Sequence, residues 1–360
     1  MRSGMLENIR LTTFSRYRAK GGKAAAFSVL FFASTLSFAT QQANPDDLRY
    51  QLSRAEYFLY KAPKTAIEHI DAIANLSEME PDLQFQANLL KAQAYLLLFK
   101  QDEAAEYLDK VFTLEKAPAF RERIFSVLYT ASTWLRRTNH HETTTKGYTC
   151  ALKHASDSSQ KLKALNGLAN TARERNNLVV ANSLYLEAKE LAERLDDSNA
   201  LASINNNLGV VASDRGNRGD AQNFFKDAYM LFQLVPNKSG ELNSGLNLLV
   251  TMLVNKDEAM YARIHSNVRA LVNEFQSTSR VAYLNWVEYG HARLQGKKLT
   301  ANEKAFLAEE FKHLDDVGLQ RMIKMYLADD LGVTVAVSEV NPKMEKIDHA
   351  WVEALVACNW

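Results

Sequence analysis

The sequence predicts an all-α solenoid, an array of about six to seven stacked helix pairs. Only 14 of the 360 residues are glycine and six are proline, and no alternating β-branched runs stand out, which favours long helices with short turns. From about Pro45 almost to the C-terminus, apolar residues recur at helical spacing. A small residue also recurs in steps of 40, 37 and 40, at Ala104, Thr144, Ala181 and Ala221. A nearly fixed step of this size is typical of stacked helix pairs.

The stretch from residue 205 to residue 228 shows the pattern most clearly. Two helical segments flank the turn formed by residues 215–220. Small residues occupy the positions where two helices cross closely, and large residues fill the remaining space. These packing positions are Leu208, Gly209, Ala212, Ala221, Phe225 and Ala228. One such pair cannot bury its apolar faces alone, so similar pairs are expected before and after it.

The other helices follow from breakers and apolar spacing. Prolines 63, 81, 118 and 236 mark the start or end of helices, and Gly332 can serve as a C-cap. Residues 333–340 are rich in β-branched side chains and could be extended. The expected helices outside the central pairs are 46–60, 64–75, 81–99, 103–114, 242–254, 257–275, 279–294, 300–314, 319–331 and 344–357, with a pair over 120–155 that turns at Thr138. Beyond Pro236 the small-residue positions no longer align.

The order of packing residues resembles the tetratricopeptide repeat. Leu-Gly or Leu-Ala is followed three residues later by Ala, and the second helix reads Ala, Phe or Tyr, then Ala. The step is longer than usual for this family and is similar to the subclass found in kinesin light chains and in bacterial sensors. The resemblance covers about residues 45–275. It implies a right-handed superhelical solenoid whose first helices line a concave, peptide-binding groove.

The N-terminus has the features of an export signal. Six basic residues and one acid precede or flank residues 24–39, a stretch of sixteen uncharged and mostly apolar residues that ends in Ser-Phe-Ala. We expect a signal peptide over residues 1–39, a solenoid over 40–331 and an extension with a capping helix over 332–360. An uncleaved membrane anchor and a buried N-terminal helix are the alternatives. The remainder carries 37 basic and 41 acidic residues, so no nucleic-acid partner is expected.

No catalytic or metal-binding motif stands out. The eight histidines form no His-Glu-x-x-His motif and no Cys/His set with zinc spacing, and there is no phosphate loop. We therefore expect neither an enzyme nor a cofactor or metal. Cys150 and Cys358 lie near the middle and the end of the predicted array, so two separate buried thiols are expected. A disulfide between them is the alternative, since an exported protein could pair its cysteines.

Amide side chains on the first helices are the candidate binding residues. The resemblance places them on the groove, one turn from the packing positions. They are Asn166, Asn170, Arg173, Asn206, Asn207, Asn243 and Asn247. An Asn side chain offers both a donor and an acceptor, so it can pair with the backbone of an extended peptide. Amides that link neighbouring helices are the structural alternative.

These features together predict an exported scaffold or adaptor that binds a protein or peptide. The expected compartment is the periplasm, with membrane contact only through an uncleaved N-terminal segment, and the expected role is in envelope assembly, secretion or signalling. The alternative is a stand-alone or truncated extracytoplasmic sensor module, related to those of diguanylate cyclases or histidine kinases.

Overall fold

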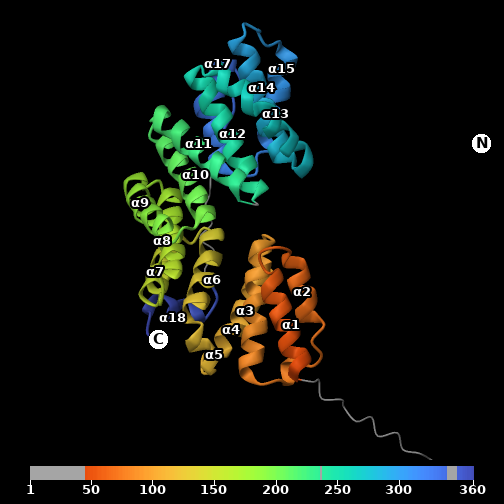
Figure 1. The fold of residues 1–360 in the computed structure, drawn as a ribbon, viewed down its shortest axis with the longest axis vertical. Coiled ribbons are helices and arrows are strands. Elements are labelled where there is room, and N and C mark those ends of the chain that lie inside the picture. Colours follow the sequence, from red (N-terminus) through yellow and green to blue (C-terminus); the bar gives the residue numbers. More distant parts are fainter. Residues whose placement is uncertain (1–44, 236, 339–346) are drawn as a thin grey trace, which may run out of the picture. The chain divides into compact units, whose positions relative to one another are not determined.

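The helices pack as successive antiparallel pairs, as the sequence predicts (Figure 1). The computed structural model describes residues 45–235, 237–338 and 347–360, and within them no strand is present. The pairs are α1 (Pro45–Phe58) with α2 (Pro63–Asp71), α3 (Pro81–Leu97) with α4 (Gln101–Thr113), α6 (Ile124–Arg137) with α7 (His141–Lys153), α8 (Ser158–Glu174) with α9 (Leu178–Arg194), α10 (Ser198–Asp214) with α11 (Arg218–Leu234), α12 (Lys238–Asn255) with α13 (Glu258–Phe275), and α14 (Thr278–Leu294) with α15 (Ala301–Lys312).

A 20-residue helix module builds the central pairs. The helices α8 to α13 each begin after an Asn or Asp whose side chain accepts a hydrogen bond from a backbone N–H of the first turn. These caps are Asp157, Asn177, Asp197, Asn217, Asn237 and Asp257. A left-handed residue precedes the caps Asn177, Asp197, Asn217 and Asp257, and before Asn217 it is Gly216, where φ is 75°. Two modules of 20 residues account for the step of about 40 between pairs.

The small residues lie where the helices cross. Ala104, Thr144, Ala181 and Ala221 are fully buried. A Cβ atom on Gly209 would lie 2.6 Å from two ring carbons of Phe225, so glycine is required at this crossing. The pattern also continues one pair further than expected, because a Cβ on Gly245 would meet Val268 of α13 at 2.7 Å.

Beyond the pairs, a last helical segment packs against the first helices α10, α12 and α14. It consists of α16 (Val317–Ile323), the π-helical turn Lys324–Ala328 and α17 (Asp329–Leu331), and Gly332 ends it in the left-handed conformation with φ of 63°. The expected helix over 319–331 is thus present, but a π-helical turn divides it into two short α-helices. Residues 333–338 form no strand.

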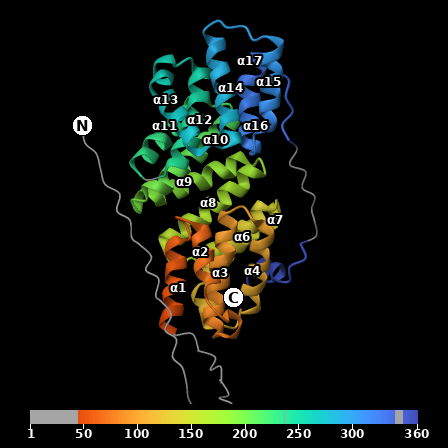
Figure 2. The same cartoon turned by 90° about the vertical axis from the view of Figure 1, so that its right-hand side faces the viewer.

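The C-terminal helix lies against the second helices of early pairs. α18 (Trp351–Ala357) packs on α7, and its dark-blue ribbon is seen beside α4 in Figure 2. The Trp351 indole donates a hydrogen bond to Asp109 of α4 at 2.8 Å. The expected helix over 344–357 begins later than predicted, since residues 347–350 are not helical and 344–346 lie outside the described residues. No described helix combines the length and apolarity needed to cross a bilayer.

The expectation of two separate thiols is wrong, because Cys150 and Cys358 form a disulfide. They are 208 residues apart in sequence, and their Cα atoms are 5.6 Å apart. The prediction assumed that each repeat contacts only its neighbours, which holds for stacked pairs. It does not hold for α18, because the chain returns to α7 after the last pair.

The close crossing at Gly209 can be tested by Gly209→Ala. The methyl group would clash with the buried Phe225 ring, so we expect the free energy of unfolding in urea to fall by about 1–3 kcal/mol. Gly219→Ala is the control: no atom lies within 4 Å of its Cβ position, and alanine is the better helix former. Equal effects of both substitutions would contradict the close-packing argument.

The disulfide can be tested by Cys358→Ser, since only non-covalent contacts would then hold α18 on α7. A cross-link over so long a loop stabilises by about 2–5 kcal/mol. We therefore expect amide hydrogen exchange in α18 to accelerate at least roughly thirtyfold. Exchange in α10 should stay unchanged. An unaltered rate in α18 would show that the disulfide contributes nothing to its docking.

Candidate functional site

The exposed faces of the first helices divide into a covered part and an open part. We call their combined surface the first-helix face. The segment α16–α17 covers it at α10, α12 and α14. Its Tyr326 hydroxyl donates to the carbonyl of Ser213 at 3.1 Å and accepts from the Ser213 hydroxyl at 3.0 Å. Among the described residues, no hydrogen bond joins α16–α17 to α3 or α6. This part of the first-helix face is open and contains a cavity.

Most of the predicted site amides join neighbouring first helices. Asn207 of α10 donates to the side-chain oxygen of Asn170 of α8 at 3.4 Å, and Tyr185 donates to the same oxygen at 2.6 Å. Asn247 of α12 donates to Asn206 of α10 at 3.2 Å. These bonds link α8 to α10 and α10 to α12, as expected for the structural alternative.

The other three predicted residues have different surroundings. Asn243 accepts a hydrogen bond from Arg280 at 2.7 Å, so it links α12 to α14. Asn166 has a buried side-chain oxygen without a hydrogen-bond partner among the described residues. The structure therefore joins Asn170 with Asn207 and Asn206 with Asn247, but it leaves Asn166 and Asn243 outside these pairs.

Arg173 lies where α16 crosses the first-helix face. A Cβ on Gly318 would be 3.8 Å from its Nη1 atom. Burial lowers the pKa of the Arg173 guanidinium, but Tyr185, Glu174 and Asp316 raise it more, so the group stays charged. Nearby, burial raises the pKa of Asp214, although Arg173 and Arg321 oppose the shift. This polar crossing marks the end of the open part.

A cavity of about 410 Å³ occupies the open part. It is bordered by the end of α1 and by α3, α6, α7 and α8. Its walls combine tyrosines, amides, threonines and three cationic side chains. They are Tyr60, Gln93, Leu96, Leu97, Tyr129, Thr130, Thr133, Arg136, Arg137, Tyr148, Lys163, Gly167 and Asn170.

The two arginines of α6 are held in place by the protein. Arg136 forms an ion pair with Glu174 at 2.5 Å, and its Nε atom is buried without a partner among the described residues. Burial lowers the pKa of Arg136, but the interactions with Glu174 and Tyr148 together outweigh it and the pKa is raised. Arg137 donates to the carbonyl of Leu96, and its guanidinium lies 4.7 Å from the centre of the Phe99 ring.

Lys163 is the remaining cation of the cavity wall. Its side chain is exposed, and no acidic partner is found for it within the described residues. Glu174 neutralises one of the two arginines, so the wall carries an excess of positive charge. The arrangement can bind a carboxylate, with the tyrosine rings packing against an apolar group beside it.

Sequence reasoning identified Asn170 of the cavity wall but missed Arg136, Arg137 and Tyr129. The spacing of the first helices contains the missing signal. Gln93 donates to Thr130 at 3.1 Å, 37 residues further on, and Asn170 pairs with Asn207 at the same separation. Position 136 lies the same 37 residues before Arg173, so this step identifies Arg136 as a groove residue. The packing pattern of the third pair is weaker, and for that reason sequence reasoning missed it.

Comparisons with known proteins support the same repeat architecture. The family model of the tetratricopeptide repeat matches residues 160–233. Aspartyl phosphate phosphatase F from Bacillus subtilis superposes with a TM-score of 0.53 at 13% identity, over 83% of this chain and 89% of that chain. The STAND protein with a tetratricopeptide repeat sensor from Pyrococcus horikoshii superposes with a TM-score of 0.58 at 13% identity, over 79% of this chain and 44% of that chain.

A third solved structure, the apo form of RapI, gives a TM-score of 0.50 at 12% identity, over 81% of this chain and 88% of that chain. A search of curated proteins found no match. At these identities the likenesses show the fold alone.

His141, the first residue of α7, makes the region sensitive to pH. Its Nδ1 atom lies 3.7 Å from Glu174 Oε2, and both atoms are buried without a hydrogen bond among the described residues. Burial lowers the pKa of His141 below its usual 6.5, although Glu174 opposes the shift. In the unfolded chain the imidazole would regain its ordinary pKa, so as pH falls below about 6.5 the unfolded state binds more protons.

We therefore expect the free energy of unfolding of the wild type to fall, relative to His141→Gln, as the pH decreases from 8 through 6.5 to 5. Urea unfolding at each pH measures the difference. His313→Gln, at an exposed site on the last pair, is the control. A difference between wild type and His141→Gln that stays constant over this range would contradict the buried-imidazole argument.

Proposed function

Because this chain is a tetratricopeptide-repeat protein, we propose that it is an adaptor that binds a segment of another polypeptide in the open part of the first-helix face. The repeat fold supports an interaction scaffold rather than catalysis. The observation that carries the proposal is the cavity of about 410 Å³ with its excess of cationic side chains. A partner segment with a carboxylate next to an apolar or aromatic side chain fits this chemistry.

The cover at α10 to α14 restricts how a segment can bind. The amides Asn206 and Asn247 are engaged with each other, and Asn247 is only 5% exposed. A peptide entering at α3 and α6 therefore meets the crossing of Arg173 with α16 before it reaches α12. We therefore expect a short segment of the partner to bind across the first helices α3, α6 and α8.

We further propose that the adaptor works outside the cytoplasm, in the periplasm, in envelope assembly, secretion or signalling. The support is the sequence of residues 1–39, which lie outside the described residues and have the features of an export signal or an uncleaved anchor. The disulfide between Cys150 and Cys358 also supports it, because such bonds persist in oxidising compartments.

A second candidate is an extracytoplasmic sensor module that passes ligand binding on to a partner protein. The fold shared with a tetratricopeptide repeat sensor of Pyrococcus horikoshii supports this candidate. The cavity is also large enough for a small carboxylate ligand. A ligand of this kind would fill the cavity without extending along the first helices.

Lys163 and Lys161 provide a matched pair for the test. Both are exposed on α8, but only Lys163 lines the cavity. Peptides selected on the immobilised full chain from a random display library serve as probes, and their affinities are measured by fluorescence anisotropy. A charge-assisted contact contributes about 1.5 kcal/mol or more, so we expect Lys163→Ala to weaken binding roughly tenfold and Lys161→Ala to leave it unchanged.

Neutralising the carboxylate of a selected peptide should remove the difference between wild type and Lys163→Ala. The adaptor proposal is rejected if no peptide is selected. The assignment of the cavity is wrong if both lysine variants weaken binding equally. The sensor candidate would be favoured if no peptide is selected but small carboxylate compounds bind to the chain.

A further inference from the structure

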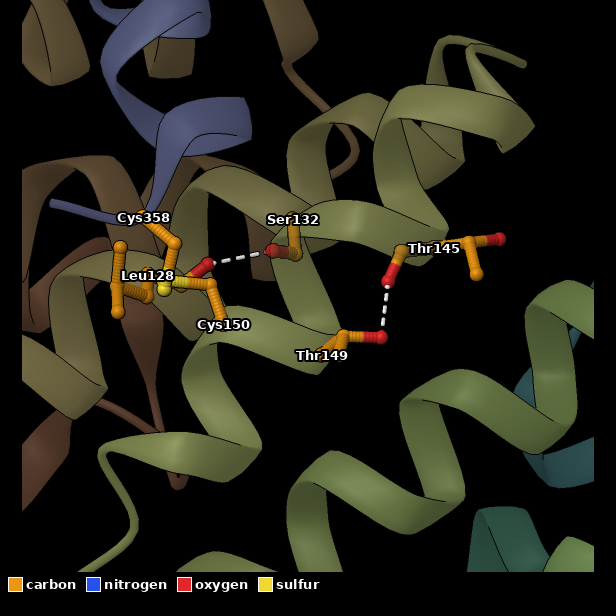
Figure 3. The surroundings of a disulfide bond; sticks show 6 residues. All are labelled: Leu128, Ser132, Thr145, Thr149, Cys150 and Cys358. Carbon is orange, nitrogen blue, oxygen red and sulfur yellow. Dashed lines mark hydrogen bonds between the residues drawn. A yellow bond between two sulfur atoms is a disulfide. The ribbon is translucent and has the colours of Figure 1, made fainter.

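The disulfide that fastens α18 to α7 has a histidine beside it. Cys150 and His154 are four residues apart at the end of α7, so their side chains lie on the same side of the helix. Cys358 follows the last residue of α18 and is joined to Cys150 (Figure 3). The two sulfur atoms and one ring nitrogen of His154 all lie within 4.8 Å of one another.

The His154 imidazole has no hydrogen-bond or ion-pair partner among the described residues, although it is half-buried. A cavity of about 680 Å³ reaches the same place and is bordered by His154, Glu115 and the C-terminal residues Asn359 and Trp360. The cavity provides a route from solvent to the histidine.

We propose that Cys150, His154 and Cys358 bind a zinc ion when the disulfide is reduced. A dithiol reductant supplies two electrons and two protons, the S–S bond breaks into two thiols, and the reductant becomes a disulfide. Zinc binding then releases the two thiol protons to solvent, because the metal binds thiolates. Two thiolates and one imidazole are three of the four ligands of a tetrahedral zinc site, and water from the cavity fills the fourth position.

The distances fit this geometry. Zinc–sulfur bonds of about 2.3 Å and zinc–nitrogen bonds of about 2.0–2.1 Å place tetrahedral ligand atoms about 3.5–3.8 Å apart. The His154 nitrogen lies no more than 4.8 Å from each sulfur atom, so it needs to move by only about 1 Å to reach this spacing. The sulfur atoms move apart once their bond is broken, through side-chain rotation.

Contacts other than the disulfide keep the three ligands together after reduction. The carboxylate of Asp109 accepts a hydrogen bond from the Trp351 indole at 2.8 Å and contacts the His349 ring nitrogen at 2.8 Å. The Trp351 ring also stacks on Phe112, with centroids 5.1 Å apart. These contacts hold α18 on α4, and α18 also packs on α7, so the three ligands stay close together in the reduced chain before the metal binds. The redox state then decides whether a covalent bond or a metal ion fastens the C-terminus.

Cobalt(II) titration of the full chain tests the proposal. The chain is reduced with a phosphine, and thiolate-to-cobalt charge-transfer absorption reports binding. We expect one cobalt ion per reduced chain, displaced by one equivalent of zinc, and no such absorption in the oxidised chain. Zinc should also slow alkylation of both cysteines and raise the unfolding temperature of the reduced chain.

Three variants make the assignment specific. His154→Ala keeps both cysteines, so its disulfide and its unfolding temperature in the oxidised state confirm that it folds; we expect its affinity for cobalt in the reduced state to fall at least tenfold. His313→Ala should bind as the wild type does. Cys358→Ser should weaken both the charge-transfer absorption and the affinity.

Two results would overturn the proposal. One is a reduced wild type that shows no charge-transfer absorption at micromolar cobalt. The other is binding by His154→Ala or Cys358→Ser that equals that of the wild type, which would assign the metal to other residues.

Discussion

The turn that ends each central helix and begins the next is the constraint on which the rest of the structure depends. After α8, α9, α10 and α12 a left-handed residue stops the helix, and an Asn or Asp cap starts each helix from α8 to α13. Because the caps recur every 20 residues from Asp157 to Asp257, the helices have nearly equal length. Equal helices bring the same positions into contact in each pair, and small residues such as Ala181 and Gly209 then allow close crossing. The regular stack of first helices, and therefore the surface they share, follows from this spacing.

The first-helix face serves two purposes along its length. From α10 onwards its amides bond to neighbouring helices, and α16–α17 packs over it through residues such as Tyr326. At α3, α6 and α8 it forms a cavity in which Arg136, Arg137 and Lys163 outnumber the acidic groups. An amide-lined groove of a repeat protein can thus be structural in one half and a candidate binding surface in the other. Asn170 belongs to both parts, because it pairs with Asn207 and also lines the cavity.

The sequence predicted the fold well and the site in part, and the difference has a physical reason. Packing positions such as Leu208 and Phe225 recur at a fixed step, so periodicity alone identifies them. The groove position of Asn170 could be inferred from the same step, but its hydrogen bond with Asn207 could not. Whether an amide or cation on a first helix has a hydrogen-bond or ion-pair partner depends on the side chains of the next helix pair. The cavity at Arg136 and Tyr129 lies at such junctions, and a pattern within one helix pair does not reveal it.

By itself the sequence determined the helix pairs, the residues at their crossings and the charge balance of the chain, because these follow from local spacing and composition. Only the tertiary structure decided where the described C-terminal residues 317–338 and 347–360 pack. They cover part of the first-helix face and then return to α7, where Cys358 joins Cys150 across 208 residues. The repeat of packing residues describes contacts between neighbouring helix pairs only. It does not predict the contact of α18 with α7, because the surface on which α18 packs exists only after the pairs have stacked.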